Sequence, residues 1–561
     1  MLNEESGTKP AVETASRGVA AREYRIKGNE AMRCGDAGLA LEFYTEAVRL
    51  DPENPENQMA LAHLHYDQFR YEEAAAVLRD VLRLRPEALQ AWINLGAALH
   101  GARQLEPAVE AYQQALRIDP ESAMACANLG LVYQDLEKLD DAACMQLRAL
   151  ALDSTMASAH NNLGSVLLEK GEVSGALACF RRALRLKPHF ADACFNVGFV
   201  HLERCEMAEA ERCFEQALAL QPDSDMFRFY IGELRLQQGR FPQGWQGYEH
   251  RWNSWQLREV KRVYQQPQWR GEPLEGKKIL LFSEQGLGDT LQFVRYAPMV
   301  AALGGRVLLE VQPRLRRLFE GMEGIEALSS PGEALPEFDW QCPLMSLPLA
   351  FQTTLDSIPN SVPYVHARPE EAAAWASRLS QEKLRVGVVW SGNRKHSRER
   401  SRSVPLPLLA ELTSVAGTSF YSLQMGDAAM SLQKLPAGHG IADLEAEQTD
   451  MAVTAAIIAN LDLVITIDTS VAHLAGAMGK PVWILLHHSP DWRWLMERRD
   501  SPWYPSARLF RKGYGESWQT LLLRVRAELE RLTLCRRQEA LRMISPAYSG
   551  AARPMVFSPR A

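Results

Sequence analysis

Apolar and polar positions follow a 34-residue period through the first half of the chain. Prolines that end short apolar-basic runs stand at Pro52, Pro86, Pro120, Pro188 and Pro222, with Ser154 where one more is expected. The same spacing separates Ala40, Ala74, Ala108, Ala142, Ala176 and Ala210. It also separates the Asn-Leu-Gly tripeptides and variants that begin at Asn94, Asn128, Asn162 and Asn196. A 34-residue unit with two apolar helical stretches predicts paired helices that stack into an α solenoid.

Residues 89–122 show the unit most fully, because small residues stand where two helices cross and aromatic residues fill the space between units. The pattern is Trp92, Leu95, Gly96, Ala108, Tyr112, Ala115 and Pro120, which resembles the tetratricopeptide repeat. We count six repeats over residues 21–224 and a degenerate seventh that extends the array to residue 256. Residues 1–20 are expected to be disordered.

The four asparagines occupy one position on the first helix of successive repeats, which lines the concave groove in tetratricopeptide proteins. Their amides both donate and accept hydrogen bonds and suit an extended peptide backbone. This ladder resembles the groove of O-linked N-acetylglucosaminyltransferase. Asn94, Asn128, Asn162 and Asn196 are therefore candidates for binding a protein acceptor. The alternative is that they hydrogen-bond within the repeat stack.

The period ends near residue 256, and a linker is expected over residues 257–276. Beyond it, short apolar runs alternate with helical runs, and a break near residues 380–384 divides the series. Strands are expected at 277–283, 306–312, 384–390, 461–467 and 481–486. This alternation predicts two parallel-sheet lobes, at residues 277–383 and 384–535, followed by a disordered tail at 536–561.

Three segments carry the candidate chemistry of these lobes. They are SEQGLGD (283–289), VWSGNRKHSRERSRSVPL (389–406) and IDTSVAHLAGAMGKPVW (467–483). Together they resemble the ADP-heptose:lipopolysaccharide heptosyltransferase superfamily over roughly residues 277–532. The resemblance implies a GT-B pair of Rossmann-like lobes and inverting, metal-independent sugar transfer from a nucleotide-diphosphate donor, with no other cofactor.

The same resemblance assigns roles to individual residues. Asp289 matches the catalytic base, although Asp also favours the N-cap of a helix, here one expected from Thr290 to Leu303. The donor diphosphate is expected to contact Gly288, Lys395, Arg402, Asp468, Thr469, Ser470 and His473. A core histidine is the alternative for His473, and a solvated loop or a polyanion-binding segment is the alternative for the basic run 394–402. The aromatic segment 490–505 either shapes a pocket or covers the sheet.

Composition narrows the classes of function. Lys and Arg number 62 against 69 Asp and Glu, and a net charge of −7 argues against nucleic-acid binding. The sequence shows neither a signal peptide nor a transmembrane run, and its nine cysteines lack metal-ligand spacing. We read these cysteines as reduced thiols of a cytoplasmic protein and expect no metal site.

The sequence therefore predicts a cytoplasmic glycosyltransferase whose repeats present a protein acceptor. Two alternatives stay open. One is a non-enzymatic tetratricopeptide scaffold with a decayed transferase domain, acting in envelope or flagellar assembly. The other is a transferase with a glycan or lipopolysaccharide-type acceptor.

Overall fold

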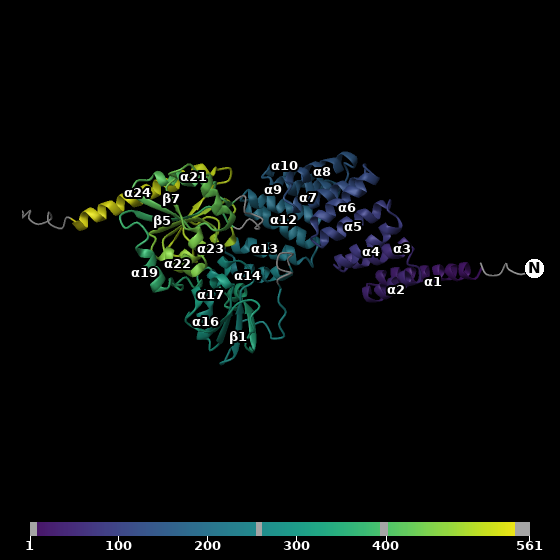
Figure 1. Cartoon of the computed structure of the whole chain (residues 1–561), viewed down its shortest axis with the longest axis horizontal. Coiled ribbons are helices and arrows are strands. Elements are labelled where there is room, and N and C mark those ends of the chain that lie inside the picture. Colours follow the sequence, from purple (N-terminus) through teal and green to yellow (C-terminus); the bar gives the residue numbers. More distant parts are fainter. Residues whose placement is uncertain (1–7, 254–260, 393–401, 545–561) are drawn as a thin grey trace, which may run out of the picture. The chain divides into compact units, whose positions relative to one another are not determined.

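The computed structural model describes residues 8–253, 261–392 and 402–544, with side chains for 17–253, 261–392 and 402–538. The chain forms two compact units (Figure 1). The first comprises Met1–His201 with Arg212–Pro222, and the second comprises Leu202–Glu211 with Asp223–Ala561. No helix in the described ranges is long and apolar enough to cross a membrane.

Paired helices form the repeats, as the 34-residue period predicts, and their residues up to Pro222 belong to the first unit except for Leu202–Glu211. They are α1 (Thr8–Arg33), α2 (Ala37–Leu50), α3 (Pro55–Asp67), α4 (Tyr71–Leu84), α5 (Leu89–Gly101), α6 (Leu105–Ile118), α7 (Ala123–Asp135), α8 (Leu139–Leu152), α9 (Ala157–Glu169), α10 (Val173–Leu186), α11 (Ala191–Glu203) and α12 (Met207–Leu220).

The periodic glycines lie where an aromatic ring of the second helix covers the first helix. A Cβ at Gly164 would lie 2.6 Å from Cε1 of Phe180, and rings block the equivalent positions at Gly28, Gly96 and Gly198. One repeat departs from this pattern, because Gln146 is buried opposite Gly130 and donates a hydrogen bond to the carbonyl of Ala127 (2.8 Å). The periodic glycines are therefore explained by the close packing of the two helices in each repeat.

We expect Gly164→Ala to lower the melting temperature of the protein. The added methyl group forces the Phe180 ring or its helix to shift, and overpacking costs about 1–3 kcal/mol. Gly38→Ala is the matched control: its Cβ meets only Asp36 at 3.5 Å, and alanine favours a helix by about 0.5–1 kcal/mol over glycine. Circular dichroism melts that show Gly164→Ala as stable as Gly38→Ala would refute this packing.

Both predicted disordered ends prove wrong where the structure describes them. Helix α1 begins at Thr8, inside the expected disordered segment 1–20, because this stretch is rich in alanine, glutamate and arginine and its one proline lies in the first turn. At the other end, α24 runs over Trp518–Ile544 and continues past residue 535. Its apolar residues Leu521, Leu522, Val525 and Leu529 are buried against the second sheet.

Two parallel sheets form the second unit, as the strand–helix alternation predicts. The first has the order β3-β2-β1-β4, and the second has the order β10-β9-β8-β5-β6-β7. The strands are β1 (Lys278–Phe282), β2 (Arg306–Glu310), β3 (Ile325–Ser329), β4 (Trp340–Pro343), β5 (Leu384–Val389), β6 (Thr418–Ser422), β7 (Ile441–Asp443), β8 (Leu463–Ile467), β9 (Val482–Leu486) and β10 (Ala507–Arg511).

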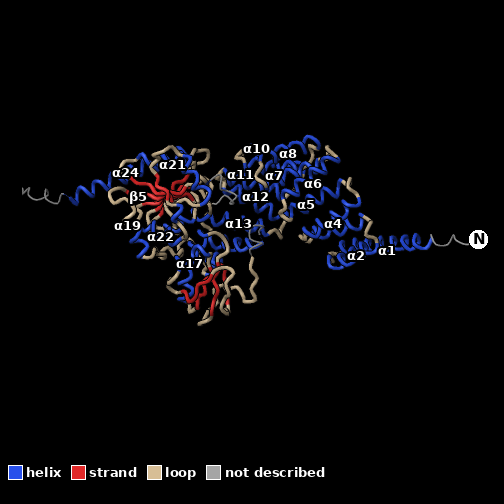
Figure 2. The backbone as a smooth tube through the Cα atoms, viewed as in Figure 1, coloured by secondary structure: helices blue, strands red, loops and turns tan. Residues whose placement is uncertain are grey.

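The second unit also contains helices, which are drawn in blue in Figure 2. They are α13 (Asp225–Gln237), α14 (Phe241–Tyr248), α15 (Leu287–Phe293), α16 (Ala297–Ala302), α17 (Pro313–Phe319), α18 (Leu347–Ala350), α19 (Pro369–Ala376), α21 (Leu406–Ala410), α22 (Met451–Ala459), α23 (Ser470–Ala477) and α24. One hydrophobic core runs from the first sheet through α15, α22 and α23 to one face of the second sheet. The two lobes are therefore packed against each other, as Rossmann-like halves of one GT-B unit.

Three predicted boundaries differ from the structure. The degenerate seventh repeat belongs to the second unit, because Trp245 of α14 packs edge-on against Trp492. The described part of the expected linker is packed on the first lobe. There Trp269 is buried, and its backbone N–H donates a hydrogen bond to the carbonyl of Gln341 (2.8 Å). The helix expected from Thr290 to Leu303 starts earlier and is broken, since Pro298 has no N–H to continue it.

Candidate functional site

Asp289 lies in the first turn of α15, directly after strand β1. Its carboxylate accepts a hydrogen bond from the backbone N–H of Gly286 (2.8 Å), which precedes the helix. The residue therefore satisfies an N-terminal donor of its own helix. Asp289 is therefore not the N-cap of a helix that starts at Thr290: the helix begins at Leu287 after the N-cap Gly286, and Asp289, its third residue, bonds back to that N-cap.

Arg493 joins Asp289 to the second lobe. Its guanidinium forms an ion pair with Asp289, a second ion pair with Asp491 (2.9 Å) and a hydrogen bond to the side-chain carbonyl of Gln292 (2.7 Å). Arg493 is only 6% exposed and lies over the ring of Trp492, 4.3 Å from its centroid. Burial raises the pKa of Asp289 more than the Arg493 guanidinium lowers it.

His473 lies in the contact between α15 and α23. It is 4% exposed, its Nδ1 is 2.8 Å from the hydroxyl of Tyr504, and its ring packs against Trp494. A Cβ at Gly288 would lie 2.8 Å from Cδ2 of His473, so only glycine leaves room for the ring. Burial and then the Arg493 charge lower the pKa of His473 to about 3, so the ring is neutral at pH 7.

The start of α23 faces the same carboxyl edge of the second sheet. Thr469 precedes the helix, and its hydroxyl lies 3.0 Å from that of Thr466. Ser470 is the first helical residue and is partly exposed. The free N–H groups of a helix start favour an anion, and this one follows strand β8 at the sheet edge where ligands of parallel sheets bind.

Asp468 has the most perturbed carboxylate of this edge. Its side chain is 18% exposed, and burial followed by the charge of Asp491 raises its pKa to about 6. The positive charges of Arg402 and Arg493 oppose that rise. Arg402 thus lies within electrostatic reach of Asp468. Lys395 lies outside the described residues.

The structure thus brings Gly288 and Asp468 against the ring of His473, with Asp289 next to Gly288 in the chain. The ring of His473 is enclosed by Tyr504, Trp494 and Gly288, which agrees with the core-histidine interpretation. A phosphate reaches this ring only if α15 and α23 separate.

Sequence reasoning missed Arg493, Asp491 and Tyr504. The only sequence feature that pointed to them was the segment 490–505, which is rich in aromatic and charged residues. From the sequence, this segment could either shape a pocket or cover the sheet. The structure favours the covering alternative, since the rings of this segment pack into the core, and it adds that Arg493 holds Asp289. The sequence analysis also gave no role to Glu284, which belongs to the segment 283–289. It is buried and forms two hydrogen bonds with Arg251, at 2.7 and 2.9 Å.

The asparagines of the repeats are half-buried on α5, α7, α9 and α11. Asn94 accepts a hydrogen bond from Gln90 (2.8 Å), and Asn128 bonds to Tyr112. Asn196 donates to Asn161 of the preceding repeat (2.9 Å). Asn162, by contrast, makes no side-chain hydrogen bond within the described part of the chain. Three asparagines of the ladder therefore hydrogen-bond within the repeats, whereas Asn162 does not do so among the described residues.

Family models match both units. Tetratricopeptide-repeat models match residues 26–78, 59–123, 157–190 and 191–224. The model "Glycosyltransferase family 9 (heptosyltransferase)" matches residues 427–517. The chain combines tetratricopeptide repeats with a heptosyltransferase-type glycosyltransferase domain. The second match includes Asp468–His473 and Asp491–Arg493 but does not reach Asp289, and it supports glycosyltransferase activity.

Part of the chain is similar to a curated protein. Protein FlbA of Caulobacter vibrioides is 29% identical over an alignment of 335 residues that covers 54% of this chain and 55% of that protein. The chain thus spans about half the length of this curated relative.

Solved structures of other repeat proteins resemble the array. MamA from Desulfovibrio magneticus RS-1 is 26% identical and covers 31% of this chain and 97% of its own, with a TM-score of 0.29. Pseudomonas aeruginosa pilF is 20% identical and covers 39% and 99%, with a TM-score of 0.32.

We expect Asp468→Asn to stabilise the glycosyltransferase domain at pH 7.5 more than at pH 4. Asp468 has a folded pKa near 6, above its ordinary 3.8, so between these values the unfolded chain ionises first and stability falls as pH rises. This loss of folding stability is complete once the pH has passed through the folded pKa, and it reaches about 3 kcal/mol at most. Asparagine does not ionise, so the Asp468→Asn variant does not suffer this loss.

The comparison uses melting temperatures of parent and Asp468→Asn at both pH values. Asp427→Asn, an exposed position, is the control. A stabilisation that is equal at the two pH values would contradict the buried, raised-pKa carboxylate.

Proposed function

We propose that the protein is a cytoplasmic, inverting, metal-independent glycosyltransferase that moves a sugar from a nucleotide-diphosphate donor to a protein acceptor. One observation carries the proposal. The Asp468-Thr469-Ser470 start of α23 follows strand β8 within the family-matched segment, and His473 of the same helix packs directly on Gly288, next to Asp289 in α15. A donor held by one lobe and a base on the other are thereby brought together.

In this proposal Asp289 accepts the proton of the acceptor hydroxyl as that oxygen attacks the sugar. A raised pKa suits a general base, because the carboxylate then binds the proton more tightly. In the structure Asp289 is paired with Arg493, so the acceptor hydroxyl has to share the carboxylate with the guanidinium. That pair favours the ionised carboxylate, against the effect of burial, and holds it in place.

The diphosphate leaving group would be held by charge and by helix-end N–H groups without a metal ion. We assign this role to the start of α23 with Thr469 and Ser470, to Arg402 and to Lys395. His473 is a positioning residue in the packed state, and separation of α15 from α23 would expose its ring and Gly288 to the donor.

A non-enzymatic scaffold is the second candidate function. The direct packing of Gly288 on His473 favours it, because that contact leaves no room for a phosphate between them. The repeats would then bind partners while the α/β unit serves as a rigid domain. Nucleotide binding separates the two candidates.

The function is tested by nucleotide-dependent protection against thermal unfolding and by turnover. We expect at least one nucleotide-diphosphate sugar to raise the melting temperature of the parent. Asp289→Asn should retain that protection but lose about 10²–10⁴-fold in turnover, the usual contribution of a general base. Asp427→Asn, on an exposed turn, should behave as the parent does.

Two outcomes would decide against the enzyme. The absence of protection by every nucleotide sugar would favour the scaffold. Protection with equal turnover in the parent and Asp289→Asn would remove Asp289 as the base.

We further propose that the asparagine ladder binds the acceptor as an extended peptide. Asn162→Ala and Asn196→Ala form a matched pair, since Asn196 is bonded within the stack and Asn162 makes no such bond. If the ladder binds peptide, Asn162→Ala should weaken acceptor use about 2–10-fold through one lost hydrogen bond and leave the melting temperature unchanged. Asn196→Ala should lower the melting temperature as well.

Changing Asn94, Asn128, Asn162 and Asn196 together to alanine should abolish protein modification while donor hydrolysis continues. Full acceptor use by this quadruple variant would favour a glycan acceptor. A stable Asn162→Ala variant with normal acceptor use would assign the ladder to the repeat stack.

A further inference from the structure

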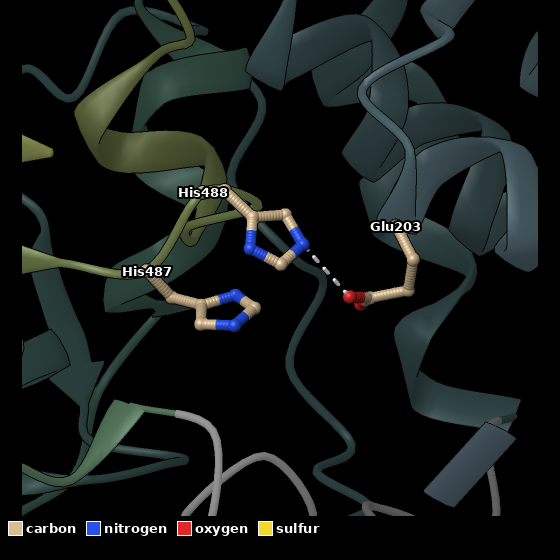
Figure 3. Close-up of side chains that lie close together, drawn as sticks. All are labelled: Glu203, His487 and His488. Carbon is tan, nitrogen blue, oxygen red and sulfur yellow. Dashed lines mark hydrogen bonds and ion pairs between the residues drawn. The ribbon is translucent and has the colours of Figure 1, made fainter. Parts of the chain in front are cut away.

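Glu203, His487 and His488 bring one carboxylate and two imidazoles together outside the candidate donor site (Figure 3). Glu203 is the last residue of α11, the histidines directly follow strand β9, and all three belong to the second unit. One ligand-type atom from each residue lies within 4.8 Å of the others. The Nε2 of His488 lies 3.2 Å from Oε2 of Glu203.

The two rings share one side of the chain, which neighbouring residues of a strand do not. In a strand, successive side chains point to opposite faces. Here β9 ends at Leu486 and the chain bends at His488 and Ser489, so the ring centroids of His487 and His488 lie 3.8 Å apart. Both rings extend toward Glu203 in Figure 3. The bend therefore assembles three groups that a continued strand would separate.

We propose that Glu203, His487 and His488 bind one divalent metal ion, Zn²⁺ or an ion with similar ligand preferences. Imidazole and carboxylate are zinc ligands, and two ligand atoms about 2.1 Å from a tetrahedral ion lie about 3.4 Å apart. The 3.2 Å between His488 and Glu203 matches that separation. The third ligand atom, a ring nitrogen of His487, lies within 4.8 Å of the other two. Three protein ligands leave a fourth position for water.

A simple ion pair between His488 and Glu203 is the competing interpretation. His488 is 9% exposed, and its Nδ1 is buried without a hydrogen-bond partner among the described residues, so the pair alone leaves the ring incompletely bonded. Lys512 lies within electrostatic reach of Glu203 and competes with a cation, but burial lowers the pKa of Lys512. Arg511 acts electrostatically on Cys205 nearby, and its Nη2 donates to the carbonyl of Trp494 (3.1 Å).

A metal here would restrain the segment that holds the candidate base. His488 precedes Asp491 and Arg493 by a few residues, and the intervening Pro490 already accepts a hydrogen bond from Gln237 (2.7 Å). An ion bound by Glu203 and both histidines would add a second anchor to this segment. The ion would therefore stabilise the structure, and the transfer reaction itself would remain metal-independent.

Calorimetry with Zn²⁺ tests the proposal on the full chain, prepared without a histidine tag and treated with a chelator. We expect one equivalent of Zn²⁺ to bind the parent. Glu203→Gln and His488→Gln should each weaken that affinity by more than about 100-fold, since loss of an outer-shell partner alone costs about 10–100-fold. His63→Gln, from an exposed His63–Asp67 pair, should leave it unchanged.

Melting temperatures keep the result interpretable if a variant is less stable. Zn²⁺ should raise the melting temperature of the parent and His63→Gln but not of the two site variants, because only a folded site binds the ion. Equal Zn²⁺ affinity in the parent, Glu203→Gln and His488→Gln would overturn the site. So would the absence of stoichiometric binding to the parent.

Discussion

The buried pairing of Arg493 with Asp289 determines how the two lobes of the α/β unit meet. Each lobe has its own parallel sheet, yet one hydrophobic core passes between them through α15 and α23. Arg493 spans that junction and neutralises a carboxylate that burial would otherwise penalise. Removing one partner from a buried pair typically costs about 3–5 kcal/mol. The candidate chemistry and the packing of the lobes therefore depend on the same few atoms.

The charge around Arg493 explains why a basic segment belongs to the proposed donor site. Asp289 and Asp491 pair with this guanidinium, and the charges of Asp491 and Arg493 both act on Asp468. One arginine among three carboxylates would repel a diphosphate. Arg402, the described end of the basic run, acts electrostatically on Asp468 and adds positive charge there. We infer that donor binding depends on Arg402 more than on His473, whose ring is enclosed.

Local and periodic features were predictable from the sequence, and contacts between distant segments were not. The lattice of Gly96 and Gly164 predicts close helix pairs, and the structure adds the rings of Tyr112 and Phe180 that require them. Strands β1, β2, β5, β8 and β9 are continuous apolar runs and were predicted, whereas β3 is only half-buried and β7 has three residues. The 468–473 motif reads as strand, turn and helix. Arg493 lies about 200 positions from Asp289, and no local pattern pairs them.

The central claim is that a donor diphosphate binds between the start of α15 and the start of α23. Hydrogen exchange of backbone amides, measured with and without a nucleoside diphosphate, tests it most directly. Binding should change exchange together in residues 286–293 and 468–477, because the ligand must part these helices and then contact both. A nucleotide that binds while exchange in both segments stays the same would contradict the account.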